Sequence, residues 1–485
     1  MEHIISALTG DLTGRLISSL MNKFSDRVCS DDKVKRLEQL LLRVEMVIEE
    51  ADGRYITNSR MLMQLKELAD AMYHGRHMLD MFRCRTLIQD SAIREVSDPF
   101  PSLKRFRTIA DASGSDKVRY LDLDKTLGTL ESCVDHMAEF VVLLSGCERM
   151  SRRPYDAYLY IDNFMFGRHT EKQRLLNFLL EYNPPGLQPA VLPIIGGLAV
   201  GKKTLVAHVC ADERVQSQFS SVLRLNEDDL LRLAQSDTLL SGKLLVVLEF
   251  LSDVNEKNWD DFFAFLAKLK KGSKLITISR FRRSEKLGTV KPILLDSHSY
   301  EEFSYLFKTL AFRSSNPNDH ARLVELAGEF AMQFQSRGSL VTANTIADVL
   351  SSNLNVSFWL CILNRCRTVA QRNLSLYGDY PKILSEHGRR VDLTNFALSP
   401  VAPLHVIPYV GICSVNTVEI KDLPRMTFRE LLLGSSVRPK GEFSLVIWES
   451  RLSPYTSFVH FVPNCAQDMP EDAPLSGRKR RGVPS

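Results

Sequence analysis

The stretch Pro193–Val209, PIIGGLAVGKKTLVAHV, decides how the middle of the chain is interpreted. Gly196, four further residues, Gly201 and Lys202 have the spacing of a phosphate-binding loop. The apolar run VLPII before the loop predicts a β-strand, and KTLVAHVC after it predicts a helix. In that setting, glycines let backbone N–H groups turn toward phosphates at the start of the helix. The stretch therefore predicts a nucleotide-binding α/β domain.

One residue of the loop departs from the motif. Lys203 stands where a Ser or Thr hydroxyl normally holds Mg²⁺, and an ammonium group cannot ligate a metal. Thr204 is rotated by about 100° round the helix, which makes it a poor substitute. Lys202 and Lys203 together could hold a diphosphate without metal. We therefore expect ADP or ATP as the ligand, with Mg²⁺ doubtful.

Two later strand ends add candidate residues. The run KLLVVLEF places Glu249 as the acid of a Walker B strand, but Phe250 stands where a second acid would help to activate water. The run GSKLITISR ends at Arg280, which could approach a γ-phosphate. The alternatives are an ordinary acid at the end of a strand and a solvated arginine beside Arg282 and Arg283.

The chain of 485 residues is too long for one compact core, so several domains are expected. The prediction is an α/β multidomain protein. Four amphipathic segments predict an N-terminal four-helix bundle: HIISALTGDLTGRLISSLMNKF, DDKVKRLEQLLLRVEMVIEEA, SRMLMQLKELADAMYHGRHMLDMFR and DKTLGTLESCVDHMAEFVVLL. The predicted parts are residues 1–145 (bundle), 146–297 (P-loop NTPase-like domain with a parallel sheet), 298–391 (helical subdomain), 392–470 (mixed α/β region with strands FSLVIW and SFVHFV) and 471–485 (basic disordered tail).

Composition limits the partners. The net charge of +4 is too weak to indicate nucleic acid or membrane binding by itself. Nine cysteines are scattered without a CxxC pair, which argues against structural zinc and for reduced thiols. No apolar run reaches the roughly 18 residues of a membrane span. We expect a cytoplasmic protein, with nuclear import as the alternative because of the basic run Arg478, Lys479, Arg480 and Arg481; a solvated tail is the simpler interpretation.

Taken in order, the motifs over about residues 1–350 resemble plant intracellular immune receptors with an Rx-type coiled-coil domain and an NB-ARC nucleotide-binding switch. FMFGRHTEKQRLLNFLL is similar to the segment on the adenine side, and LLDSHSYEEFSYLFKTLAF to the start of the small helical subdomain. The resemblance implies a nucleotide site made of Phe166, Gly167, Arg168, Gly196, Gly197, Leu198, Ala199, Val200, Gly201, Lys202, Lys203, Thr204, Leu205, Glu249 and Arg280.

The departures from the family pattern matter as much. The loop lacks the glycines expected at Leu198 and Ala199, and RGSLVTA has Leu340 where the family has the proline that packs on adenine. The acidic motif of the coiled-coil domain is RHMLD, in which only Asp80 is kept. No leucine-rich repeat is visible, so the resemblance is to a truncated form.

These features lead to one preferred function and two alternatives. The preferred one is a degenerate disease-resistance-type protein that binds ADP or ATP weakly or structurally, has little or no hydrolysis, and pairs its N-terminal bundle with other immune receptors or signalling proteins. No catalytic residue and no metal ligand is assigned. The alternatives are a working ATP/ADP switch and a nuclear adaptor that binds no nucleotide.

Overall fold

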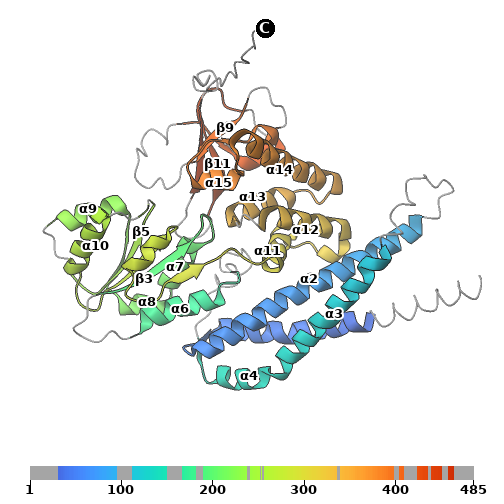
Figure 1. Cartoon of the computed structure of the whole chain (residues 1–485), viewed down its shortest axis with the longest axis horizontal. Helices are drawn as coiled ribbons and strands as arrows, with labels where there is room; N and C mark the ends of the chain where they lie inside the picture. Colours follow the sequence, from blue (N-terminus) through green and yellow to red (C-terminus); the bar gives the residue numbers. More distant parts are fainter. Residues whose placement is uncertain are drawn as a thin grey trace, which may run out of the picture. The chain divides into compact units, whose positions relative to one another are not determined.

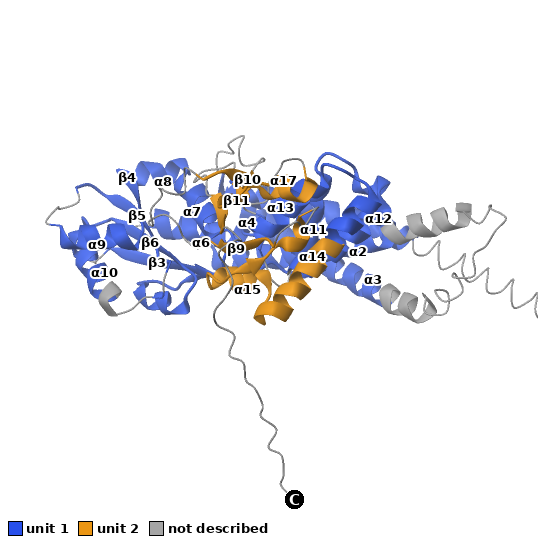
Figure 2. Cartoon of the chain, turned by 90° about the horizontal axis from the view of Figure 1, so that it is seen from above, with its two compact units in different colours: residues 1–363, 450–456 blue, residues 364–449, 457–485 orange. Residues whose placement is uncertain are grey.

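A computed structural model describes residues 31–95, 112–149, 166–181, 189–236, 241–251, 253, 256–335, 339–397, 403–408, 423–434, 438–450 and 457–463. The chain divides into two compact units, residues 1–363 with 450–456 and residues 364–449 with 457–485 (Figure 2). The boundary between the units at residue 363 lies inside a helix. The boundaries of the five domains predicted from sequence stay predictions. In the part of the chain that the structure describes, no helix has the length and apolarity needed to cross a membrane.

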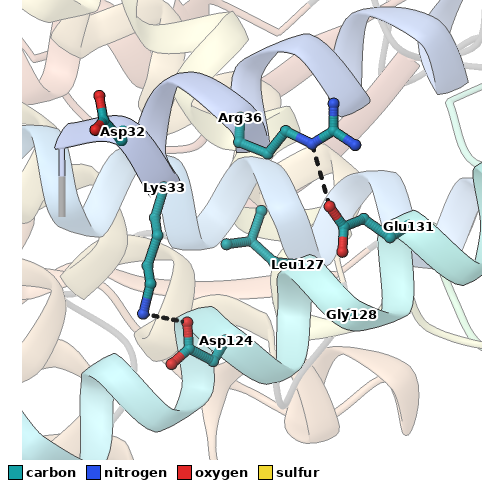
Figure 3. A pocket seen from close by; sticks show the side chains of 7 residues that line it. All are labelled: Asp32, Lys33, Arg36, Asp124, Leu127, Gly128 and Glu131. Carbon is teal, nitrogen blue, oxygen red and sulfur yellow. Dashed lines mark hydrogen bonds and ion pairs between the residues drawn. The ribbon is translucent and has the colours of Figure 1, made fainter. Parts of the chain in front are cut away.

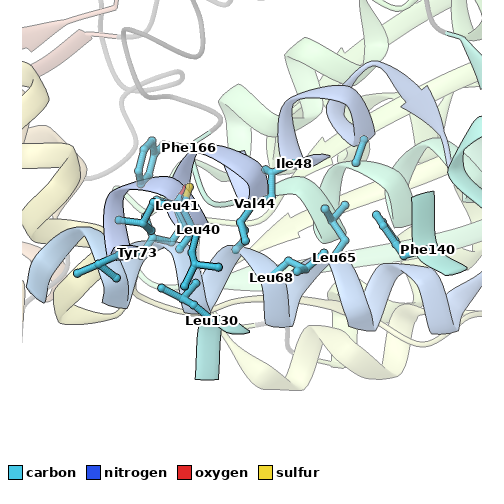
Figure 4. Close-up of a cluster of buried hydrophobic side chains, with 14 of the residues drawn as sticks. Leu40, Leu41, Val44, Ile48, Leu65, Leu68, Tyr73, Leu130, Phe140 and Phe166 are labelled. Atoms are coloured by element: carbon cyan, nitrogen blue, oxygen red, sulfur yellow. The ribbon is translucent and has the colours of Figure 1, made fainter. Parts of the chain in front are cut away.

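The N-terminal part is a bundle of helices. Residues 31–52 form a helix, followed by α2 (Ser59–Glu95), α3 (Ala112–Asp135) and α4 (Met137–Ser145). The short strands β1 (Arg54–Tyr55) and β2 (Glu148–Arg149) pair antiparallel at its end. Leucine and other apolar side chains at helical spacing fill the bundle core, among them Leu40, Leu41, Val44, Ile48, Leu65, Leu68, Leu130 and Phe140 (Figure 4). The first predicted helix lies outside the described residues.

The last predicted helix of the bundle is two helices, because the chain breaks at His136. Its Nδ1 lies 2.7 Å from the Ser132 carbonyl, which also accepts from the His136 amide. Helix α4 then begins at Met137 in a new direction, and it buries Phe140 and Leu144.

The middle of the chain is a parallel α/β layer structure. Strands β3 (Ala190–Gly196), β4 (Ser221–Leu225), β5 (Leu244–Glu249), β6 (Lys274–Ser279) and β7 (Ile293–Leu295) lie in the order β4-β5-β6-β3-β7, and all are parallel. Helices α6 (His169–Leu180), α7 (Lys202–Cys210) and α8 (Glu213–Gln218) cover one face; α9 (Glu227–Gln235) and α10 (Glu256–Lys268) cover the other (Figure 1). The predicted P-loop NTPase-like arrangement is therefore confirmed.

Each face of this sheet has its own apolar core because neighbouring residues of a strand point to opposite faces. Leu245 and Val247 of β5 pack with α6 and α7, whereas Leu244, Val246 and Leu248 pack with α9 and α10. This explains why the strand is a continuous apolar run rather than an alternating one.

A helical segment follows the sheet. It contains the short 3₁₀ helix η2 (Arg282–Leu287), α11 (Tyr300–Phe312), η3 (Pro317–Asp319), α12 (Ala321–Gln335), α13 (Leu340–Leu350) and the start of α14 (Val356–Tyr377). Its core is aromatic: the Phe307 and Phe330 rings stack at 5.5 Å, and the buried Trp359 ring meets Phe330 edge-on at 6.3 Å. The predicted helical subdomain is present, and α14 extends it beyond the segments recognised from sequence.

The second unit is mixed α/β. Helix α15 (Pro381–Glu386), η4 (Thr394–Phe396) and α17 (Phe428–Leu433) accompany strands β8 (Val391–Asp392), β9 (His405–Pro408), β10 (Arg425–Thr427), β11 (Phe443–Glu449) and β12 (Ser457–Val462). The sheet order is β10-β11-β12-β9-β8, with β10 and β11 parallel and the other pairs antiparallel. Both strands predicted in this region are confirmed as β11 and β12.

Candidate nucleotide site

The phosphate loop joins β3 to α7 at the carboxyl end of the sheet. In the sheet, β3 lies between β6 and β7, but the next strand along the chain, β4, lies at the far edge. In open α/β sheets, ligands bind outside the carboxyl ends of the strands at such a reversal of order. The loop turns through two residues with positive φ, Ala199 (58°) and Gly201 (92°). Gly196 is needed for close packing, because a Cβ there would lie 2.5 Å from the Leu295 carbonyl oxygen.

The lysine of the loop contacts the loop's own backbone. Lys202 Nζ donates to the carbonyl of Gly196 at 2.7 Å and to that of Gly197 at 2.6 Å. A phosphate that binds Lys202 must therefore compete with these two carbonyls. The ammonium is held at the mouth of the cradle, where the positive end of α7 also lies.

The residues at the two positions where the motif would normally hold a metal contact each other. Lys203 Nζ lies 2.7 Å from Glu249 Oε2, and their side chains are 37% and 20% exposed. Phe250, in the place of a second acid, is buried beside Phe262 with ring centroids 6.4 Å apart. Its amide donates to the Ile278 carbonyl at 2.9 Å, which continues the strand pairing. The end of β5 therefore offers one carboxylate, and an ammonium is bonded to it.

A backbone hydrogen bond connects the loop to α13. The amide of Leu340 donates to the carbonyl of Ala199 at 3.2 Å. Leu340 is the first residue of α13, where the amide has no partner within the helix. The cap is Ser339, whose hydroxyl accepts from the Thr342 amide and leaves the Leu340 amide available to the loop. Leu340 therefore contributes an amide donor that a proline at this position would lack.

The remaining residues of the loop region divide by burial. Val200 and Leu205 are buried in the core between the sheet and α6–α8, so they act in packing. Leu198 and Thr204 are half-buried. Arg280 ends β6 half-buried, with its guanidinium carbon 4.8 Å from the Phe281 ring centroid. The basic run at 478–481 lies outside the described residues.

The three residues expected on the adenine side lie in a contact between α6, α11 and the bundle, and their role toward a nucleotide stays a prediction. Phe166 is buried, with its ring 4.9 Å from Tyr73 of α2 and stacked at 5.6 Å on Tyr305 of α11. Gly167 has a positive φ of 65°. The buried Arg168 donates to the Asp296 carbonyl, and burial lowers the pKa of its guanidinium. In this structure, the Phe166 ring packs between α2 of the bundle and α11.

A buried ion pair in the same contact was not predicted from sequence. His169 Nδ1 lies 2.6 Å from Asp52 Oδ1, and their side chains are 6% and 25% exposed. Burial alone would lower the pKa of His169, but the Asp52 charge and hydrogen bond outweigh it and raise the pKa. Burial likewise opposes the ionised Asp52, yet His169 and Lys172 hold its pKa below the ordinary value. No sequence pattern signals a pair 117 positions apart.

Further side chains fix the bundle to α6 and α11. Gln173 of α6 donates to the Arg54 carbonyl at 2.7 Å and accepts from the Ile56 amide at 3.2 Å. Lys308 of α11 pairs with Asp80, and their side chains are 11% and 27% exposed. Asp80, the acid kept from the family's acidic motif, therefore has a cationic partner in the helical segment.

A shallow groove lies on the bundle between the helix 31–52 and α3, away from the phosphate loop. Two exposed ion pairs cross it, Lys33 with Asp124 at 2.6 Å and Arg36 with Glu131 at 3.1 Å (Figure 3). Exposed pairs of this kind contribute about 1 kcal/mol or less to stability. We assign the groove no function.

Comparison with known proteins gives a consistent set of relatives. Residues 8–108 match the model of the Rx N-terminal domain family. The chain is 23% identical over 389 residues to disease resistance protein RGA2 of Solanum bulbocastanum, covering 74% of this chain and 38% of that protein. It is also 23% identical over 348 residues to RGA1 of the same species (65% and 34% covered) and 22% identical over 404 residues to RPP13-like protein 1 of Arabidopsis thaliana (75% and 37% covered).

A solved structure, domain III of the replication initiation protein DnaA of Thermotoga maritima, matches at 11% identity and covers 48% of this chain and 90% of that chain. Its TM-score is 0.22, so the match supports no argument here. The chain spans less than two fifths of the length of the relatives named above. The chain is thus similar to plant disease resistance proteins and carries a match to the Rx N-terminal domain, in agreement with the resemblance that the motifs indicated. The predicted truncation stays a prediction.

Proposed function

We propose that this protein acts in plant defence as a degenerate nucleotide-binding module that holds an adenine nucleotide, turns it over slowly or not at all, and signals through protein contacts of its N-terminal bundle. The observation that carries the proposal is the phosphate loop, in place between β3 and α7 but lacking the groups that would cut the ligand. Its relatives bear the name of disease resistance proteins, which supports the defence role.

Binding is supported by the parts of the cradle that remain. The loop keeps its glycine at position 196, its turn at Gly201 and its lysine beside the start of α7. Because Lys202 must exchange two carbonyl partners for a phosphate, we expect weak affinity. Purified protein should release ADP or ATP on denaturation, identified by chromatography and mass spectrometry. An empty protein that also ignores millimolar ADP would reject this part of the proposal.

Slow turnover is supported by the end of β5. Attack on a γ-phosphate needs a group that orients water, and the buried Phe250 side chain has no polar atom. Removal of one element of such a site typically costs about two to three orders of magnitude in rate. We expect phosphate release from ATP near the background rate with Mg²⁺ present. Robust turnover that disappears in Lys202→Ala would instead establish a working ATPase.

Action through protein contacts is supported by apolar side chains that the bundle leaves exposed. They include Leu42 and Met46 of the helix 31–52, and Val142 and Leu143 of α4, which are between 53% and 70% exposed. Exposed apolar clusters often mark protein contact sites. Co-immunoprecipitation with co-expressed disease resistance receptors should weaken in Met46→Glu and Val142→Glu, with Lys35→Glu as the surface control. Equal recovery of all variants would argue against the bundle as the contact surface.

A further inference from the structure

We infer that Lys203 does the work of the metal in this site, so that the loop selects a metal-free nucleoside diphosphate over its Mg²⁺ complex. The inference rests on the proposed function and specifies its ligand. Mg²⁺ requires a near-octahedral set of oxygen ligands at about 2.1 Å. The residues at its expected position do not provide one, because an ammonium group has no lone pair and Glu249 is already bonded to it.

Lys203 competes with a metal ion for the Glu249 carboxylate. Lys203 Nζ lies 2.7 Å from Glu249 Oε2, a normal charge-assisted hydrogen bond. A Mg²⁺ ion that bound this carboxylate would be repelled at close range by the ammonium unless the ammonium moved away. With Phe250 buried next to Glu249, the end of β5 has no second carboxylate to compensate. Among the described residues, no group of three or more His, Cys, Asp or Glu side chains could hold a metal instead.

The pair of Lys203 and Glu249 also balances charge around a phosphate. A carboxylate without a partner at this position would repel an incoming diphosphate, and in a metal-dependent site the cation removes that repulsion. Here the paired ammonium neutralises Glu249 in the same way. The ammonium has three N–H donors, and the Glu249 bond uses one of them. Lys203 also follows Lys202 at the start of α7, so both cations lie where the helix favours an anion.

The experiment is a titration of the full chain with ADP by calorimetry, in excess EDTA and in millimolar Mg²⁺. The wild-type chain should bind ADP about tenfold tighter in EDTA, which corresponds to about 1.4 kcal/mol. Lys203→Thr supplies the hydroxyl that a metal site needs and should reverse the preference. Lys203→Met removes the charge without adding a ligand, so it should weaken binding in EDTA and gain nothing from Mg²⁺. The exposed Lys271→Thr is the matched control and should behave like the wild type.

The outcomes separate the two proposals. If Mg²⁺ strengthens ADP binding by the wild type, the inference about Lys203 is overturned and nucleotide binding is left intact. If the wild type binds no ADP but Lys203→Thr binds ADP with Mg²⁺, nucleotide binding by the natural chain is rejected. That result would still support the exclusion of metal by Lys203. Failure of every variant to bind, with thermal unfolding showing that each is folded, would overturn both.

Discussion

The ion pair between Asp52 and His169 should make the contact between the bundle and α6 sensitive to pH. At an effective dielectric constant of about 20, unit charges 2.6 Å apart attract each other by about 6 kcal/mol. Desolvation costs several kcal/mol per ion in a buried pair, and Asp52 keeps a quarter of its side chain exposed. We therefore expect a net coupling of about 2 kcal/mol between the two side chains.

The direction of the pH effect follows from the two pKa shifts. A raised pKa of His169 gives stability that is complete below the ordinary value of 6.5 and is lost as the pH rises through the folded value. A lowered pKa of Asp52 gives stability that is present above 3.8 and is lost as the pH falls toward the folded value. The coupling should be largest between pH 3.8 and 6.5 and should fall to about 1 kcal/mol, the value of an ordinary hydrogen bond, in alkaline buffer.

A double-mutant cycle measures this coupling. The variants are Asp52→Asn, His169→Gln and the combination of both. The Ile56 amide, which donates to Gln173 across the same contact, reports local opening by its protection from hydrogen exchange. A coupling that has the same size at pH 6 and pH 9, or that is absent at pH 6, would refute the assignment of an ionised pair.

Substitutions at three further sites test other parts of the structure by urea unfolding followed with tryptophan fluorescence. Gly196→Ala places a Cβ 2.5 Å from the Leu295 carbonyl, so it should lower the free energy of unfolding by about 2 kcal/mol; no loss would mean that the loop can shift. Lys274→Met should cost about 2 kcal/mol because the buried ammonium donates to the last carbonyls of α6, and an unchanged midpoint would contradict that role. Asp80→Asn should cost about 2 kcal/mol by leaving Lys308 without a carboxylate, whereas Asp80→Glu should retain much of the stability.

The sequence predicted the elements that local pattern determines. The apolar run before Gly196 and the amphipathic run after Gly201 became β3 and α7, because strand and helix periodicity are properties of short windows. The two C-terminal strands were found in the same way. The break at His136 was missed because the residues on both sides of it continue a helical pattern.

The sequence could not predict contacts between distant segments. Phe166 has the character of a ligand-contacting aromatic, yet its ring packs between Tyr73 and Tyr305, residues far from it in the chain. The motif indicated that Lys203 would disturb a metal site, but only the three-dimensional arrangement brings its ammonium to Glu249, at the end of a strand that β6 separates from β3. The assignment of nucleotide-binding residues therefore stays a prediction.

The bond from Leu340 to Ala199 has a consequence for how this chain can vary. Both partners are main-chain groups, so the side chain at position 340 can change without loss of the tie between the phosphate loop and α13. Nineteen of the twenty amino acids carry the required amide, and proline is the exception. Proline would thus be the one exchange at this position that cuts the tie, although the first turn of a helix otherwise accepts proline readily.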